Sequence, residues 1–227
     1  TDIYTLSLHD ALPIYDVDAG VALALREKAQ VVLGLGGGSA MDTAKAIAAV
    51  ARDGRRTVDY FKDPPREPAG LPIVAVPTTS GTGAEVTPVV VLTDPAERRK
   101  FGATSSAFGA AVALVDPELT LSMPPEVTAS SGMDALAHAM ESYLSKNADP
   151  FSELFAVEAT SLVFRHLRAA CADGADPEAR TGMAVASVMG GITLAQAGVI
   201  HAHGYGMAIG GQFGRSEEHT SELQSRH

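Results

Sequence analysis

A glycine-rich segment at residues 33–45 has the composition of a phosphate-binding turn. An apolar run precedes it and an alanine-rich run follows it, which predicts a strand, a turn and a helix in that order. The glycines Gly36–Gly38 carry no Cβ, so the backbone can adopt a positive φ and approach a ligand closely. Ser39 is expected to cap the helix, with Asp42 in capping-box position. Amides at such a helix start bind phosphate or pyrophosphate, although a turn required only for packing has the same composition.

A second loop of the same kind, residues 77–87, is rich in hydroxyl groups and glycine. It follows the short apolar run at residues 71–76, which is typical of a buried strand. In an open α/β sheet, ligands lie outside the carboxyl ends of the strands. We therefore expect the two loops to converge on one ligand.

Residues with metal-ligating side chains occur in the second half of the chain. Asp134 and His138 are spaced i, i+4, so on a helix they share one face and can converge on one metal ion. A surface ion pair or a packed core histidine has the same spacing. His201 and His203 lie in the apolar, glycine-rich run at residues 198–213, where an imidazole without a partner is costly to bury. A carboxylate with several imidazoles suits Fe(II) or Zn(II) better than Mg²⁺ or Ca²⁺.

These candidates require a sheet in the first half of the chain and helices in the second, and the composition changes accordingly near Met123. In the first half we expect a helix at 17–28, strands at 31–35, 71–76 and 111–115, a loop at 52–70, an extended segment at 88–92 and a charged turn at 93–100. In the second half we expect helices at 125–145, 150–172 and 177–197, each punctuated by proline or glycine.

Composition excludes several classes of partner. The 227 residues carry a formal net charge of -10, which argues against nucleic acid and against an anionic membrane surface. No apolar run reaches membrane-spanning length without interruption. The one cysteine, Cys171, excludes an intrachain disulfide framework. We expect a soluble, cytoplasmic protein.

The two ends of the chain resemble the conceptual translation of short-read sequencing adapters. Residues 4–14 and 215–225 each read back to such an adapter, in a frame that continues into the neighbouring codon. We therefore expect residues 1–14 and 215–227 to be adapter-derived and non-native.

Three motifs together resemble the iron-containing (group III) alcohol dehydrogenases. They are residues 36–45, 77–87 and 132–143, in the family's order, and the similarity covers essentially all of residues 15–214. The resemblance implies a dehydroquinate-synthase-like architecture. Its parts are an NAD(P)-binding α/β domain at 15–123, truncated at its N-terminus, and an all-helical metal-binding domain at 124–214, truncated at its C-terminus.

The resemblance also implies which residues form the site. The implied metal ligands, for Fe(II) or Zn(II), are Asp134, His138 and His203, with His201 left open as a neighbour. The implied NAD or NADP contacts are Gly37, Gly38, Ser39, Asp42, Thr78, Thr79, Thr82, Lys100 and Leu119.

Two departures from the family pattern bear on the site. The family's fourth ligand is a histidine in a His-Gly pair shortly beyond Phe213, where the adapter-like sequence begins here. In addition, Met207 stands where many members carry a proton-relay histidine. The family's first strands, with the acidic residue that helps choose NAD over NADP, are also missing.

The resemblance therefore implies that the parent protein is an NAD(P)-dependent, metal-dependent alcohol dehydrogenase with a small-molecule alcohol or aldehyde as substrate. At full length we expect it to form a homodimer or larger homo-oligomer. A lyase resembling dehydroquinate synthase would need clustered cations for an anionic substrate, and the helical half has only the scattered Arg165, Arg168 and Arg180. For the 227-residue chain as given, by contrast, we expect a third outcome, an inert polypeptide. A sheet without its first strands exposes edges, and a metal site one ligand short binds weakly.

Overall fold

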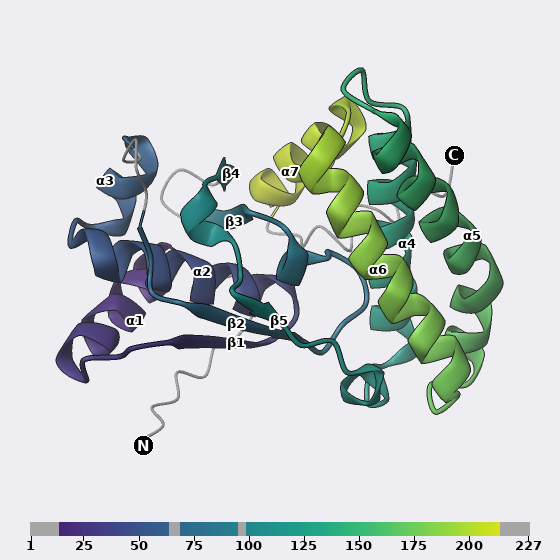
Figure 1. The fold of residues 1–227 in the computed structure, drawn as a ribbon, viewed down its shortest axis with the longest axis horizontal. Helices are drawn as coiled ribbons and strands as arrows, with labels where there is room; N and C mark the ends of the chain where they lie inside the picture. Colours follow the sequence, from purple (N-terminus) through teal and green to yellow (C-terminus); the bar gives the residue numbers. More distant parts are fainter. Residues whose placement is uncertain (1–13, 64–68, 95–98, 214–227) are drawn as a thin grey trace.

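The computed structural model describes residues 14–63, 69–94 and 99–213. An α/β half and a helical half lie side by side (Figure 1). The elements of the α/β half are α1 (Ile14–Arg26), β1 (Val32–Gly36), α2 (Gly38–Asp53), α3 (Thr57–Lys62), β2 (Ile73–Pro77), η1 (Ala84–Val86), β3 (Val89–Asp94), β4 (Arg99–Thr104), η2 (Ser106–Phe108), β5 (Val112–Ala113) and η3 (Pro117–Thr120). Those of the helical half are α4 (Pro125–Tyr143), α5 (Pro150–Ala172), α6 (Pro177–Ala197) and α7 (His201–Phe213). The predicted fold class, α/β followed by helices, is confirmed.

A parallel sheet of order β1-β2-β5 forms the centre of the α/β half. Its register pairs Val32 with Ile73 and Val74 with Val112. Helix α2 packs closely on one face, since a Cβ at Gly34 would lie 2.9 Å from the Cβ of Ala44. The main apolar core is formed by α2 together with α1, α3, β3 and η2. Its buried members include Val17, Ile47, Val50, Tyr60, Val90, Leu92 and Phe108.

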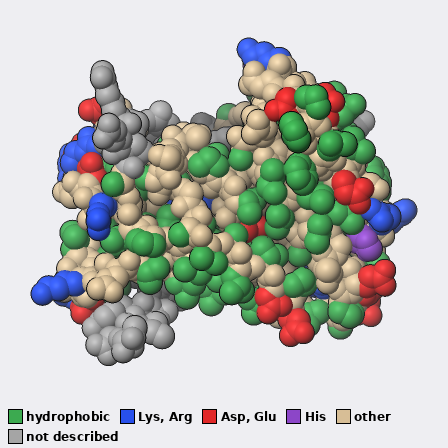
Figure 2. Space-filling view, in the orientation of Figure 1, with side chains coloured by type: hydrophobic (Ala, Val, Ile, Leu, Met, Phe, Trp, Pro, Cys, Tyr) green, Lys and Arg blue, Asp and Glu red, His purple; other side chains and the backbone are tan. Residues whose placement is uncertain are grey.

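The opposite face of the sheet is apolar and open. Leu33 and Leu35 on β1 are 57% and 56% exposed, and Val112 and Leu114 are 50% and 49% exposed. Figure 2 shows hydrophobic side chains gathered where these strands lie in Figure 1. An exposed apolar surface of this kind normally marks a face that another element covers.

Several sequence-based boundaries in the α/β half are wrong. The extended segment predicted at 88–92 is confirmed as part of β3. The charged turn predicted at 93–100 is wrong at its described ends, because residues 93–94 and 99–100 belong to the paired strands of an antiparallel hairpin, β3 and β4. Strand β4 has charged, glycine and alanine positions without apolar alternation, so pairing to β3 stabilises it rather than its own pattern. The predicted loop at 52–70 contains α3, which is held where the backbone N–H and Oγ1 of Thr57 donate to Asp18 Oδ1.

The long helices were predicted more closely because their start signals are local. Asp149 caps α5 by accepting from the amides of Phe151 and Ser152, and Asp176 caps α6 in the same way. Proline occupies the first turn of α4, α5 and α6, where its missing N–H costs nothing. Among the described residues, no helix combines the length and apolar character needed to cross a membrane.

The loop between β2 and η1 joins the two halves by close backbone contact. Gly83 has a φ of +60°, and a Cβ there would lie 2.6 Å from the Cα of Gly191 on α6. Only residues without side chains allow this approach. Glu85 follows directly and is 3% exposed.

Arg180 on α6 is a buried cation that holds the segment between the two halves. It is 2% exposed. Its guanidinium donates to the carbonyl oxygens of Gly174 (2.8 Å) and Met123 (3.2 Å) and to Thr128 Oγ1 (2.9 Å). The planar fork of arginine can serve three acceptors at once. Arg180 therefore fixes the chain at the start of α4.

Arg180→Met should lower the free energy of unfolding by about 3 kcal/mol, because the buried acceptors would lose their donors. Urea denaturation measures the change. Arg165→Met is the matched control, since that side chain is 54% exposed and its loss should cost no more than about 0.5 kcal/mol. Equal stability of the two variants would contradict the assigned role of Arg180.

Burial raises the pKa of the Glu85 carboxyl above its ordinary value of 4.5, and its own backbone amide and Lys45 oppose this shift. A carboxyl with a raised folded-state pKa stabilises the fold only while protonated, so its contribution falls as pH rises from about 4.5 through the folded-state pKa. Glu85→Gln should therefore gain stability relative to the parent between pH 5 and pH 8 in denaturation curves. Glu158→Gln, on a side chain 50% exposed, should show no such trend.

Candidate metal and dinucleotide site

Helix α2 begins at the glycine turn without a side-chain cap. Its N-cap is Gly37, in extended conformation, and because glycine has no side chain, none caps the first-turn amides at this position. The expected N-cap, Ser39, lies inside the helix. That prediction was wrong because Gly36, with a φ of +147°, turns the chain into the helix earlier. The helix start thereby keeps the backbone character of an anion site.

Asp42 belongs to a buried ionic link rather than to a capping box. Its Oδ1 lies 3.2 Å from Lys45 Nζ, and its Oδ2 accepts from the Val91 amide at 2.9 Å. Lys45 is fully buried and also donates to Val89 O (2.9 Å) and Thr87 Oγ1 (3.4 Å). The pair therefore fastens α2 to β3.

The two glycine-rich loops lie against each other, as the sequence predicts. The amide of Thr78 donates to Gly36 O at 2.9 Å. A Cβ at Gly38 would lie 2.7 Å from Thr82 Cγ2, so the second loop lies directly on the start of α2. A Cβ at Gly37 would meet Thr79 Oγ1 at 3.4 Å.

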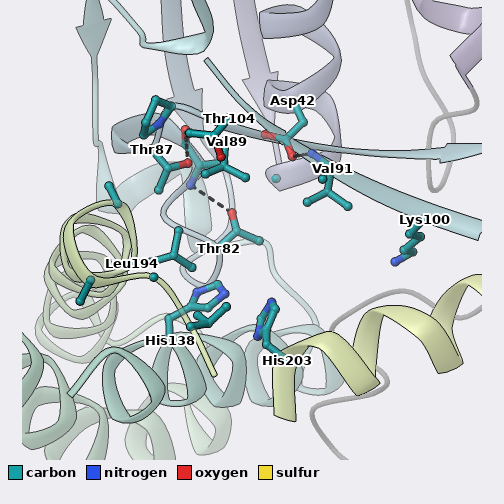
Figure 3. Close-up of a pocket in the computed structure, with 18 of the residues that line it drawn as sticks. Asp42, Thr82, Thr87, Val89, Val91, Lys100, Thr104, His138, Leu194 and His203 are labelled. Atoms are coloured by element: carbon teal, nitrogen blue, oxygen red, sulfur yellow. Dashed lines mark hydrogen bonds between the residues drawn. The ribbon is translucent and has the colours of Figure 1, made fainter. Parts of the chain in front are cut away.

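A cavity of about 430 Å³ lies between the two halves. Of the implied cofactor residues, Gly38, Ser39, Asp42, Thr82 and Lys100 line it. Figure 3 shows Asp42, Thr82 and Lys100 on one side of the cavity and His138 and His203 on the other.

The remaining implied cofactor residues do not line this cavity. Gly37 lies in the first glycine-rich loop and Thr78 and Thr79 lie in the second, and none of the three is among the lining residues. Leu119, in η3, is 39% exposed and also outside the lining.

Three predicted metal ligands form one cluster. Single ligand atoms of Asp134, His138 and His203 all lie within 4.8 Å of one another. Asp134 Oδ1 is 3.7 Å from His138 Nε2, and the two histidine rings have centroids 4.8 Å apart. Asp134 is fully buried and His138 is 4% exposed. His201 is exposed and is not in the cluster found among the described residues.

This donor set fits a divalent transition metal. A buried carboxylate with two imidazoles is the chemistry of Fe(II) and Zn(II) sites. His138 Nδ1 is buried without a hydrogen-bond partner in the described part of the chain. Such a nitrogen is costly to bury, and the proximity of the His138 side chain to two other potential ligands indicates a site built for an ion.

Glu141 is a site residue that the sequence analysis missed. It is 6% exposed on α4, and its Oε2 accepts from the amides of Ile200 (3.0 Å) and His203 (3.2 Å). The signal was present in the spacing, because Glu141 lies three residues after His138 and seven after Asp134, on the same helix face. Met207, the other departure from the family pattern, has a side chain outside the described part of the structure.

Comparison with known proteins agrees with this geometry. A family model for iron-containing alcohol dehydrogenase matches residues 7–117, and the model for the C-terminal part of the same family matches residues 128–220. Long-chain-alcohol dehydrogenase 1 of Geobacillus thermodenitrificans is 44% identical over 204 residues, 88% of this chain and 51% of that protein. The NAD-dependent methanol dehydrogenase of Bacillus methanolicus is 40% identical over 87% of this chain and 52% of its own length.

Solved structures give the same result. Sulfoacetaldehyde reductase from Bifidobacterium kashiwanohense, solved in complex with NAD⁺, superposes with a TM-score of 0.89 and 36% identity, covering 96% of this chain and 58% of that one. The chain spans about half the length of the curated relatives it matches. With both family models matched in order along it, the chain belongs to the iron-containing alcohol dehydrogenase family.

Proposed function

We propose that the chain forms the dinucleotide- and metal-binding part of an NAD(P)-dependent alcohol dehydrogenase. The reaction moves a hydride from the carbinol carbon of an alcohol to the nicotinamide ring, and the hydroxyl proton leaves, giving an aldehyde or ketone and NAD(P)H. The observation that carries the proposal is the shared cavity. The glycine-turn residues line one wall, and His138 and His203 line the other.

Each wall has a separate task in this proposal. The first-turn amides at Gly38 and Ser39 bind the dinucleotide phosphates, and Lys100 provides positive charge on the same side. Asp134, His138 and His203 would hold Fe(II) or Zn(II), which when bound supplies a Lewis acid for the substrate oxygen. The protein contributes position and electrostatics, whereas hydride chemistry belongs to the cofactor.

A lyase on the same fold is less well supported. It needs cations that face an anionic substrate, and the guanidinium of Arg180 is buried on Gly174, Thr128 and Met123. Arg165 pairs with Glu158 on the exposed side of α5. These contacts favour the dehydrogenase over the lyase. The proposal also includes two units, at 15–123 and 124–214, a cytoplasmic location and self-association of the full-length parent protein.

Metal binding is the first test. After removal of bound metal with a chelator, the chain should bind Zn²⁺ in calorimetry. Loss of a residue that only orients a metal ligand weakens metal binding by roughly 10–100-fold. Because His138 and His203 are proposed as ligands themselves, His138→Ala and His203→Ala should each weaken Zn²⁺ binding by more than that. His201→Ala is the control and should leave the dissociation constant unchanged. Tight Zn²⁺ binding by both variants would overturn the assigned ligand set.

The dinucleotide wall is tested by Gly38→Ala, whose new Cβ would lie 2.7 Å from Thr82 Cγ2 and push the two loops apart. NAD⁺ or NADH should bind roughly tenfold more weakly, about 1.4 kcal/mol, in fluorescence titration. Gly109→Ala is the matched control, because its nearest contact is an ordinary 3.4 Å. If the unsubstituted 227-residue chain binds neither dinucleotide nor metal, the inert-chain alternative is correct.

A further inference from the structure

Glu141 contacts both the backbone and the ring of His203. Its Oε2 accepts from the amides of Ile200 and His203, while its Oε1 lies 3.7 Å from His203 Nδ1. Glu141 lies on α4 and His203 on α7, so one carboxylate joins the two helices that carry the metal cluster.

The two amides are those that a helix start leaves without intrahelical partners. Helix α7 begins at His201, so Ile200 precedes the helix and His203 is its third residue. In a capping box, side chains within the same segment satisfy these two donors. Here a carboxylate from another helix accepts both bonds, and its negative charge suits the positive end of the α7 dipole.

The position of His203 depends on where α7 begins. Asp134 and His138 are fixed relative to each other by one helix, whereas His203 arrives on a separate helix after Gly198, whose φ is +72°. The connection from α6 consists of a glycine and two further residues, and its own geometry therefore sets the start of α7 only loosely. The Glu141 contacts supply the missing constraint.

We propose that Glu141 is a positioning residue that places His203 for metal binding, by capping α7 and facing the imidazole. The proposal rests on the proposed function, because it gives the cluster of Asp134, His138 and His203 its role. A carboxylate that orients a metal-ligating histidine is a general feature of metal sites.

A double-mutant cycle on the whole chain tests this placement, with the Zn²⁺ dissociation constant as its readout. Glu141→Ala should raise the constant by about 10–100-fold. In a His203→Ala background the same change should add no more than about twofold, because Glu141 acts through that residue. Glu141→Gln keeps an acceptor oxygen for both amides and should restore most of the affinity. Glu126→Gln, exposed on the same helix, is the matched control.

Hydrogen exchange of the metal-free chain provides an independent readout. The amides of Ile200 and His203 should exchange faster in Glu141→Ala than in the parent and the Glu126→Gln control. Should Glu141→Ala fail to fold, Glu141→Asp carries the same comparisons with a carboxylate one methylene shorter.

The outcomes separate this proposal from the proposed function. Parent-like Zn²⁺ affinity in Glu141→Ala, or an equal loss in the His203→Ala background, would overturn the placement of His203 by Glu141. If the parent chain binds no Zn²⁺, the proposed function fails. Faster exchange in Glu141→Ala would then still support the placement, and unchanged exchange would overturn it.

Discussion

The burial of polar side chains along one face of α4 is the constraint on which the rest of the helical half depends. Asp134, His138 and Glu141 are each at most 6% exposed. Buried carboxylates and imidazoles are tolerated only when other groups meet them. Helices α5 and α6 pack around α4. The amides of Ile200 and His203, at the start of α7, meet the carboxylate of Glu141 on this face. The fold of this half is therefore inseparable from its candidate metal site.

The α/β half also contains buried charged side chains, the ion pair of Lys45 and Asp42. Lys45 is fully buried, and its ammonium group is held by Asp42 and by acceptors on and before β3. Removing one partner of a buried ion pair costs far more folding free energy than replacing both partners with well-packed apolar residues. The β3–β4 hairpin, which carries Lys100 to the cavity, is thus fixed to the helix that begins at the glycine turn. Each wall of the cavity is held by a buried charge that links two elements.

Features encoded by local chemistry could be predicted from the sequence, whereas features created by pairing could not. Helices α5 and α6 begin at an aspartate cap followed by proline, and their predicted bounds are confirmed. Strand β4 depends on its partner and left no periodic signal. Ser39 had the right residue type for a cap, but the backbone of the glycines decided where the helix began. Glu141 was missed because its hydrogen-bond partners are the backbone amides of Ile200 and His203, and a backbone amide is present in almost any residue type.

The open apolar face of the sheet has a consequence for how the polypeptide behaves in a test tube. Leucine and valine side chains along β1 and β5 stand in water, and each square ångström withdrawn from water would return roughly 25 cal/mol. Two copies of the chain that associate through these faces would gain that free energy even if the shapes of the two surfaces did not match. A sedimentation profile with several species would then report adhesive, concentration-dependent clustering, and detergent or added salt would redistribute it.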